Sequence, residues 1–484
     1  MQFAVIQRVM GLLLIVFSAT QLPPALVSLL YADGAHRAFL AALAITSFAG
    51  LALWLPVRSV QREIRVRDGF AIVTLFWSLL ALFGALPFAL AERPHMPFAD
   101  AFFESISGLT TTGATVLTGI DELPASIRYY RQQLQWLGGM GIVVLAVAVM
   151  PMLGVGGMQL YKAETPGPMK ESKLTPRIRE TAKALWYIYL GLTVACAAAY
   201  WAAGMDAFDA IGHSFATIAI GGFSTHDASL GFFQNPAISA VAIVFMLLAG
   251  ANFAVHFHAW HARSLQHYLR DAETRAYLKI VGGVAVATVA GLLVARTFDN
   301  WGEALHHGLF QAVSIATTTG FTTAPFHLWP AFLPVLLLMA SFIGGCAGST
   351  AGGLKVIRAL LLYRQGVREI FRLVHPDAIA HVKIGGKPMS DQVVSAVWGF
   401  FSLYVSSFAV LALLMNAVGG VDLVTAFSAV AACLNNLGPG LGDVASHYAG
   451  VSTAGKWVLA FAMLLGRLEL FTLLVLFTPA FWRD

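Results

Sequence analysis

Long apolar runs, each able to cross a lipid bilayer as one helix, constrain this chain more than any other feature of its sequence. A helix crosses the ~30 Å hydrocarbon layer with about 20 apolar residues. Ten segments of this kind are found, at residues 8–31, 37–56, 70–91, 132–161, 184–204, 236–262, 278–296, 330–362, 392–417 and 455–481. Only 11% of the 484 residues are charged, against about 25% in soluble domains. We therefore expect an all-α polytopic membrane protein and exclude a soluble domain with a large core.

The charged residues favour one topology. The net charge is +5, and basic residues gather in every second connection between the apolar segments. Positively charged connections resist translocation, so we assign them to the cytoplasm. Both termini then lie on the cytoplasmic side, which agrees with an even number of crossings. Topology explains the basic residues, so we expect no nucleic-acid partner. The first apolar run lacks a small-residue cleavage site, and we expect it to be retained as a helix.

Four connections on the opposite side share an unusual pattern. Each contains an apolar stretch too short to cross, followed by a run rich in Gly, Thr or Asn, at residues 98–116, 205–225, 301–323 and 421–441. Their central glycines recur about every hundred residues and are Gly113, Gly222, Gly320 and Gly438. This recurrence indicates a fourfold repeat of helix, short re-entrant helix, polar loop and helix.

The repeats divide the chain into five parts. Two extra transmembrane helices occupy residues 1–68. The four concatenated pore repeats follow at 69–181, 182–277, 278–390 and 391–484, and the second helix of the third repeat is interrupted by glycines. We expect the repeats to surround one pseudo-fourfold pore.

The four polar loops suit a cation. Irregular backbone at membrane depth is tolerated where it is buried in protein or lines a water-filled cavity. The short helices would point their partially negative C-terminal ends at the axis. Since the loops carry no carboxylate, backbone carbonyls would select the ion, and threonine hydroxyls can add an oxygen below. The predicted potassium ligands are Thr111, Thr112, Gly113, Ile220, Gly221, Gly222, Thr318, Thr319, Gly320, Asn435, Asn436, Leu437 and Gly438. One such loop alone would be an ordinary polar turn, but four at equivalent positions favour a filter.

Other polar residues are assigned to support these loops. Carboxylates at the starts of the short helices are expected to cap them, without binding the ion directly. These caps are Asp100, Asp206 or Asp209, Asp299 and Asp422. Glu104 lies within the first short helix, where it could hydrogen-bond to hold the loop.

A glycine-rich run in the eighth apolar segment is a candidate gate. Glycine costs about 1 kcal/mol per residue in a helix relative to alanine, so a flexible intramembrane loop is one interpretation. Tight packing of small residues between helices is the other. Arg467 lies mid-span, and it either raises a barrier to cations or makes a structural interaction with a carboxylate or with carbonyls of the short helices. Lys355 either tethers the loop or extends to the cytoplasm. The gate candidates are Gly344, Gly345, Gly348, Ser349, Thr350, Gly352, Gly353 and Arg467.

Four motifs together resemble a known family. Thr-Thr-Thr-Gly-Ala-Thr at 110–115 resembles the filter of the Trk/Ktr/HKT superfamily of potassium transporters. The runs at 220–227, 344–350 and 435–440 look like the TrkH subfamily. The similarity covers essentially the whole chain. It implies a homodimer in the bacterial inner membrane, with one pore per protomer and a gating loop under the filter. It also implies a cytosolic, TrkA-like nucleotide-binding regulatory subunit, with potassium as the transported ion and no catalytic cofactor.

Two other functions compete with a gated potassium pore. An ion-coupled secondary symporter, driven by protons or sodium, would also use broken helices, but the repeats here run in the same orientation. An intramembrane enzyme would need a nucleophile or a metal set, and no Ser-His or His-Glu-His arrangement is present. We therefore expect no enzyme activity. Because each loop offers few stacked carbonyls, we predict weaker discrimination against sodium than in tetrameric potassium channels.

Overall fold

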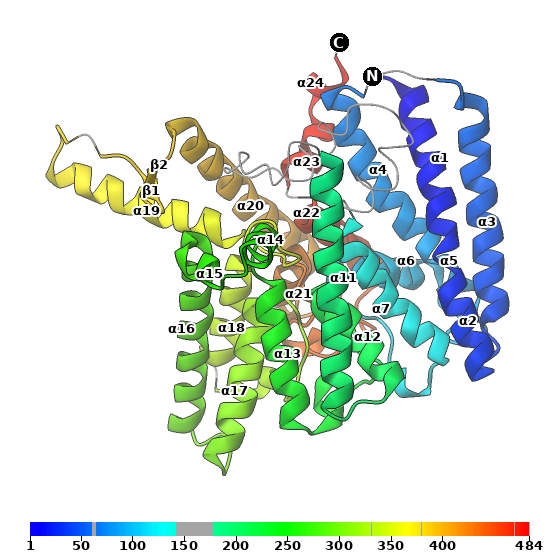
Figure 1. Ribbon diagram of the computed structural model, residues 1–484, viewed down its shortest axis with the longest axis horizontal. Helices are drawn as coiled ribbons and strands as arrows, with labels where there is room; N and C mark the ends of the chain where they lie inside the picture. The colour runs from blue at the N-terminus through cyan, green and yellow to red at the C-terminus, as the bar shows by residue number, and fades with distance from the viewer. Residues whose placement is uncertain (61–63, 142–177, 331, 379, 469, 484) are drawn as a thin grey trace.

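The protein is an assembly of helices with one short β-hairpin (Figure 1). The computed structural model describes all 484 residues except 61–63, 142–177, 331, 379, 469 and 484. The hairpin pairs β1 (Lys383–Ile384) with β2 (Lys387–Pro388). This all-α architecture agrees with the fold expected from the apolar segments.

Six helical segments in the described part of the chain are long and apolar enough to cross a membrane. They are Phe3–Tyr31, His36–Val57, Arg67–Leu90, Lys183–Ala202, Ala272–Val294 and Asp391–Val418. The first of them combines α1 (Phe3–Ala19) with α2 (Leu22–Tyr31), and the third combines α4 (Val66–Gly84) with α5 (Leu86–Leu90). The others correspond to α3 (His36–Trp54), α11 (Ile178–Ala202), α16 (Ala272–Val294) and α20 (Asp391–Val418).

Two of the expected spans are sharply bent, so their description as single helices was wrong. In segment 236–262, α13 (Pro236–Ala249) and α14 (Phe253–Ala262) meet at 96°. The amide N–H of Ala254 is bound by the Asn252 side chain, which starts α14 as a new helix. In segment 455–481, α22 (Thr453–Arg467) is followed by α23 (Phe471–Leu474) in a new direction.

The eighth expected span is interrupted, as its glycines predicted. The helix α18 ends at Ile343 (Phe332–Ile343), and α19 begins at Val356 (Val356–Val374). Residues 344–355 between them form the segment that we call the glycine loop. The fourth expected span, 132–161, overlaps α7 (Ala125–Gly139), and most of the remainder lies outside the described residues.

Four short helices precede the polar loops, as predicted. They are α6 (Phe98–Leu109), α12 (Ala207–Ile218), α17 (Trp301–Ala316) and α21 (Leu423–Leu434). Each has 12 or 16 residues, fewer than the roughly 20 needed to cross the hydrocarbon layer.

The predicted caps of these short helices are half right. Asp206 and Asp422 each accept backbone N–H bonds at the start of their helix. Asn300, and not Asp299, caps α17. At α6 the capping position is Pro97, and Asp100 instead binds Lys456 Nζ at 2.7 Å. This ion pair joins α6 to α22, two elements far apart in the sequence.

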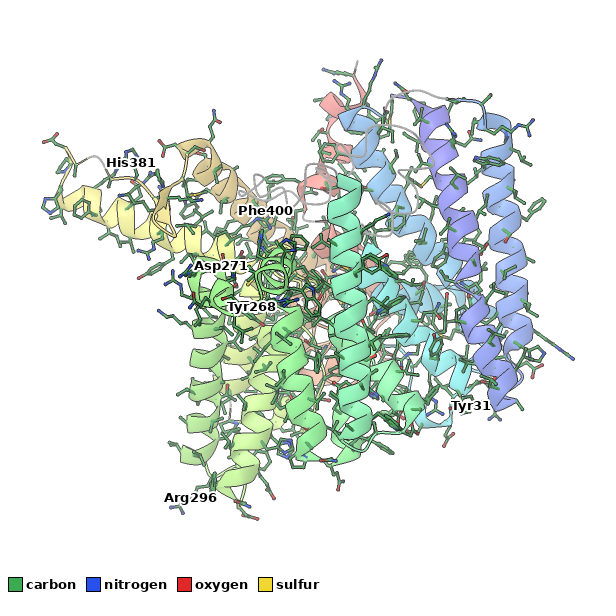
Figure 2. The ribbon with its side chains drawn as sticks, in the orientation of Figure 1. Tyr31, Tyr268, Asp271, Arg296, His381 and Phe400 are labelled. Atoms are coloured by element: carbon green, nitrogen blue, oxygen red, sulfur yellow. The ribbon has the colours of Figure 1, made fainter. Side chains whose placement is uncertain are left out.

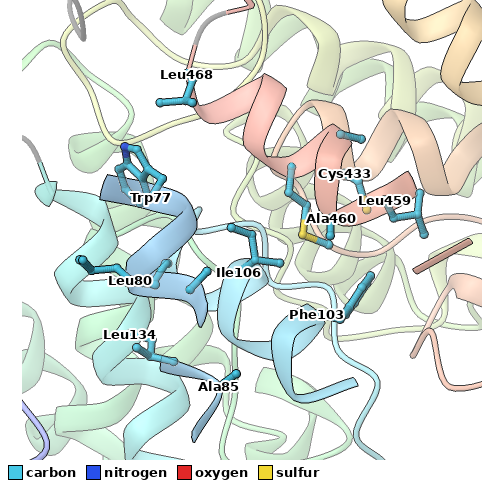
Figure 3. Packing of buried hydrophobic residues seen from close by; sticks show 14 of the residues in the cluster. Trp77, Leu80, Ala85, Phe103, Ile106, Leu134, Cys433, Leu459, Ala460 and Leu468 are labelled. Carbon is cyan, nitrogen blue, oxygen red and sulfur yellow. The ribbon is translucent and has the colours of Figure 1, made fainter. Parts of the chain in front are cut away.

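The short helices pack in several apolar clusters, of which the largest contains residues of α6 and α21. Figure 3 shows side chains of α4, α6, α7, α21 and α22 meeting in it. Phe103 and Ile106 on α6 pack in the same cluster as Leu459 and Ala460 on α22. The two chain ends lie on one face of the molecule (Figure 1), as an even number of crossings requires. The repeat boundaries at 69, 182, 278 and 391 stay predictions.

Candidate functional site

The four polar loops have the same backbone conformation although their sequences differ. We call residues 110–115, 219–224, 317–322 and 435–440 the first to fourth loops. In each, the second residue after the short helix and the glycine two positions later have positive φ. These pairs are Thr111 (56°) and Gly113 (80°), Ile220 (53°) and Gly222 (77°), Thr318 (65°) and Gly320 (85°), and Asn436 (52°) and Gly438 (97°). Positive φ is rare for residues other than glycine, so its recurrence at four non-glycine positions marks a shared structure.

One hydrogen bond repeats at the start of each loop. It runs from the amide before the key glycine back to a carbonyl in the last turn of the short helix. The four bonds are Thr112 N to Ser107 O (2.9 Å), Gly221 N to Ala216 O (2.8 Å), Thr319 N to Ser314 O (2.8 Å) and Leu437 N to Ala432 O (2.8 Å). This is a helix-ending turn that satisfies otherwise unpaired carbonyls. It fixes how each loop leaves its helix.

The key glycines link the loops into a closed ring. A Cβ atom on each glycine would collide with a carbonyl oxygen of the next loop. The distances are 2.0 Å from Gly113 to Gly221 O, 2.1 Å from Gly222 to Thr319 O, 2.1 Å from Gly320 to Leu437 O and 2.7 Å from Gly438 to Thr112 O. The order runs from first loop to second, third, fourth and back to the first. The structure therefore brings the predicted ligand residues of all four loops together, and we call them the ring.

Side chains within the ring are tied to their surroundings. The Thr112 hydroxyl lies 2.7 Å from the Thr110 hydroxyl, and the Thr319 hydroxyl lies 2.7 Å from the Thr317 hydroxyl. Thr110 and Thr317 in turn donate to backbone carbonyls of the short helices. The Asn435 amide donates to Ser341 at 2.8 Å. The ring can therefore offer a cation its backbone oxygens without moving these side chains. Among the described residues, no group of three or more His, Cys, Asp or Glu side chains could hold a metal ion.

A cavity of about 350 Å³ opens on the side of the ring from which the short helices enter. We call it the vestibule. All four key glycines line it, together with Arg131, His226 and His447 among others. The vestibule gives the ring one shared approach.

His226 on the vestibule wall bridges two carboxylates. Its Nε2 lies 3.1 Å from Asp209 Oδ2, and its Nδ1 bonds to Asp121. Burial disfavours the charged imidazole, but the bonds to Asp209 and Asp121 outweigh that cost and raise the pKa of His226 above its ordinary 6.5. Burial acts to raise the pKa of Asp121, and the bond to His226 lowers it below 3.8 overall.

The glycine loop lies against the other side of the ring. Gly352 N donates to Thr318 Oγ1 at 2.7 Å, and Gly353 N donates to Asn435 O at 3.2 Å. Thr350 Oγ1 donates to Ile218 O at 2.9 Å, just before the second loop. The predicted gate residues in this loop therefore bond to the third and fourth loops and to the last residue of α12, just before the second loop.

The glycine loop is irregular because its backbone is left-handed at several positions. Gly344, Gly348 and Gly353 have φ of 69°, 70° and 74°, which glycine adopts at little cost. Lys355 also has a φ of 77°, a conformation that costs a non-glycine residue energy. The Lys355 ammonium donates to Ala351 O, so the tethering interpretation of this lysine is confirmed. Gly345 and Ser349 pack against one another within the same loop.

Arg467 lies below the first loop. Its guanidinium donates to Thr111 Oγ1 at 3.3 Å, to Thr350 O at 3.3 Å and to Gly138 O at 2.6 Å. Gly138 is in the last turn of α7, where carbonyls carry partial negative charge. Arg467 therefore lies next to the ring and binds a carbonyl of α7, while its predicted role as a barrier to cations stays a prediction.

The polar residues of α7 were missed by the sequence analysis. Arg131 is buried and donates to Glu104 Oε1 at 2.8 Å and to Ser224 O at 2.9 Å. Glu104 also accepts from Thr115 Oγ1 at 2.9 Å, so its predicted role in holding the first loop is confirmed. Gln135 donates to Gly221 O at 2.5 Å. An arginine beside an apolar segment was the signal that could have revealed this network.

The fold and this ring define a class: a polytopic membrane protein whose re-entrant loops close one shared site. A family model described as TrkH, cation transport protein, matches residues 35–483. The chain belongs to the TrkH family of cation transport proteins.

Similar proteins span the whole chain. The Trk system potassium uptake protein TrkH of Halomonas elongata is 56% identical, and that of Escherichia coli K12 is 55% identical, each over 100% of both chains. A crystal structure of the potassium transporter TrkH from Vibrio parahaemolyticus superposes with a TM-score of 0.91 at 55% identity. It covers 100% of this chain and 100% of that one.

Proposed function

We propose that this protein carries potassium ions across the membrane through the ring and that the glycine loop and Arg467 gate the passage. The main observation behind this proposal is that four equivalent loops form a closed ring, in which the key glycine of each loop packs against a carbonyl oxygen of the next loop. The relatives named above as potassium uptake proteins support potassium as the ion.

Selection in this proposal rests on backbone oxygens. The short helices end at the ring, and a helix C-terminus carries about half a negative charge. Rings of carbonyls can replace the hydration shell of potassium without a fixed negative charge. The absence of side-chain carboxylates from the four loops in the sequence supports this mode over a ring of Asp or Glu.

In this proposal the gate and the passing cation compete for the same oxygens, which lie on the side of the ring that faces the glycine loop. Thr318 Oγ1 accepts from Gly352 N, and Thr111 Oγ1 accepts from Arg467. A cation that leaves the ring on this side must displace both donors and pass a positive guanidinium. Electrostatic interactions are strong where water is excluded, so the closed loop should hold back conduction until it moves.

The wider setting is proposed on the family motifs. The protein would work as a homodimer in the bacterial inner membrane, with both termini cytoplasmic. A TrkA-like nucleotide-binding subunit in the cytosol would act on the gate. The position of both termini on one face supports the topology, and the sequence has no glycine-rich phosphate loop of its own.

Rubidium flux into proteoliposomes, with and without competing sodium, tests the ring. Gly113→Ser places a side chain against Gly221 O, where a Cβ atom has only 2.0 Å. We expect the preference for rubidium over sodium to fall about tenfold, a change of ~1.4 kcal/mol. Gly119→Ser is the matched control, since Gly119 also has positive φ (66°) but nothing lies within 4 Å of its Cβ position.

Two results would count against the proposal. An unchanged preference in Gly113→Ser would mean that the loops are structural turns and that the ion passes elsewhere. Uptake that follows an imposed proton or sodium gradient, with no potassium gradient, would favour the coupled symporter instead.

A further inference from the structure

Glu273 binds both ends of the glycine loop from the side opposite the ring. It lies in the first turn of α16 and is 7% exposed. Its Oε1 accepts from Ala347 N at 2.6 Å and from Ile357 N at 3.1 Å. Ala347 is near the start of the loop, and Ile357 lies just beyond its end. One carboxylate oxygen therefore joins the entry and the exit of the loop.

The bond to Ile357 replaces a missing helix cap. The first amides of a helix have no partner within the helix, and an anion there is favourable. At α19 the capping position is held by Lys355, whose side chain makes no capping bond. Glu273 supplies the oxygen from another helix, so the start of α19 depends on α16.

Other bonds hold the same side of the glycine loop. Cys346 N donates to Gly250 O at 2.9 Å, and Phe253 N donates to Gly348 O at 3.0 Å. Gly250 and Phe253 flank the bend between α13 and α14. The loop is thus bound on one face by the ring and on the other by the bend and by α16.

The start of α16 is itself well fixed. Asp271 caps the helix by accepting from Thr274 N at 2.7 Å. Figure 2 shows Asp271 close to Tyr268, beside α14 and α15 (Gln266–Arg270), and far from Arg296 beyond the other end of α16. Glu273 is therefore presented to the loop by a capped helix, not by a free end.

We propose that Glu273 is a positioning residue that latches the glycine loop in place under the ring. The proposal rests on the gating role of that loop. Loss of the carboxylate frees both ends of the loop, weakens its bonds to the ring and raises cation flux. Selectivity should stay unchanged, because Glu273 contacts no residue of the four ring loops in the bonds described above.

The test is rubidium flux by the full-length protein in proteoliposomes, with sodium competition as a second readout. Glu273→Ala removes both bonds and should raise flux at least about tenfold, since the loss of a single hydrogen bond to a carboxylate already accounts for that factor. Glu273→Gln keeps an acceptor oxygen but no charge, and should give an intermediate rise. Glu303→Ala removes the same charge from the first turn of α17, at an exposed side chain, and should leave flux at the wild-type value.

Arg467→Ala separates failure of the latch from failure of the gate. Increased flux in Arg467→Ala, with wild-type flux in both Glu273 variants, would overturn the latch and leave the gate intact. Wild-type flux in all three variants would overturn both proposals. A rise in Glu273→Ala that also abolishes the preference for rubidium would overturn the latch, because it would report a damaged ring. If Glu273→Ala cannot be purified, Glu273→Gln tests the latch alone. An intermediate rise in flux supports the latch, and wild-type flux overturns it.

Discussion

The two halves of the ring share one backbone geometry but are held in different ways. The first and second loops are held by a buried charged pair, Arg131 and Glu104, which are 1% and 0% exposed. The third and fourth loops are held by neutral groups. Ser314 Oγ donates to Phe321 O at 2.7 Å, and Tyr448 OH donates to Gly438 O at 2.7 Å. The conformation of a loop is thus set by its own turn and glycine, and very different supports can preserve it.

The first and second loops, held by the charged pair, form the charged half of the ring, and the third and fourth loops form the neutral half. Removing one support should cost more stability in the charged half. A buried ion pair adds little net stability compared with apolar packing, yet breaking it leaves a charge without compensation. A neutral hydroxyl that is lost leaves only one carbonyl without a partner. The comparison therefore predicts unequal responses to the removal of one supporting group.

The largest effect is expected for Arg131→Ala. Glu104 would stay buried without its cation, and we expect a loss of about 3–5 kcal/mol in stability. Thermal unfolding of the purified protein in detergent measures it. Arg296→Ala, beyond the end of α16 where the side chain is exposed, is the control and should unfold like wild type. An Arg131→Ala protein with wild-type stability would remove the basis of the comparison.

A smaller effect is expected for Tyr448→Phe in the neutral half. The change removes only the hydroxyl that donates to Gly438 O. We expect a loss of about 1 kcal/mol in stability, measured in the same unfolding assay. A loss as large as that of Arg131→Ala would mean that the neutral supports matter as much as the charged pair.

The smallest effect is a pH dependence in the charged half. The raised pKa of His226 means that its bridge to Asp121 and Asp209 is complete below pH 6.5 and is lost as pH rises through the raised value. The lowered pKa of Asp121 keeps that carboxylate charged down to below pH 3.8. We therefore expect rubidium flux to change by up to about twofold as the vestibule pH rises above 6.5.

His226→Gln should flatten this pH profile. The titratable groups that face His226 are Asp121, Asp209 and His213. His447 also lines the vestibule and offers a control as His447→Gln. If His447→Gln flattened the profile and His226→Gln did not, the pH dependence would arise at His447 and not at the bridge of His226.

The four loops of the ring could be predicted from the sequence, but the side chains that support them could not. Four glycines at regular spacing predicted loops that the structure brings into contact. Arg131 was missed because its partner Glu104 is 27 residues away on another helix, and such pairing depends on tertiary packing. Asp299 was named as the cap of α17, but its neighbour Asn300 holds that position, and both residue types cap helices about equally well. The bend at Asn252 was missed because this residue is a single polar side chain within a long apolar run, which looked like one continuous helix.

One chain supplies all four quarters of the ring, and this has a genetic consequence. In a tetramer of identical subunits, one codon change alters four equivalent positions at once. Here the left-handed position two residues before the key glycine is encoded four times, as Thr111, Ile220, Thr318 and Asn436. Each copy can mutate alone, so under the proposed function selection can adjust ion preference at one loop at a time. A set of single, double, triple and quadruple substitutions at these codons would report how cooperatively the quarters act.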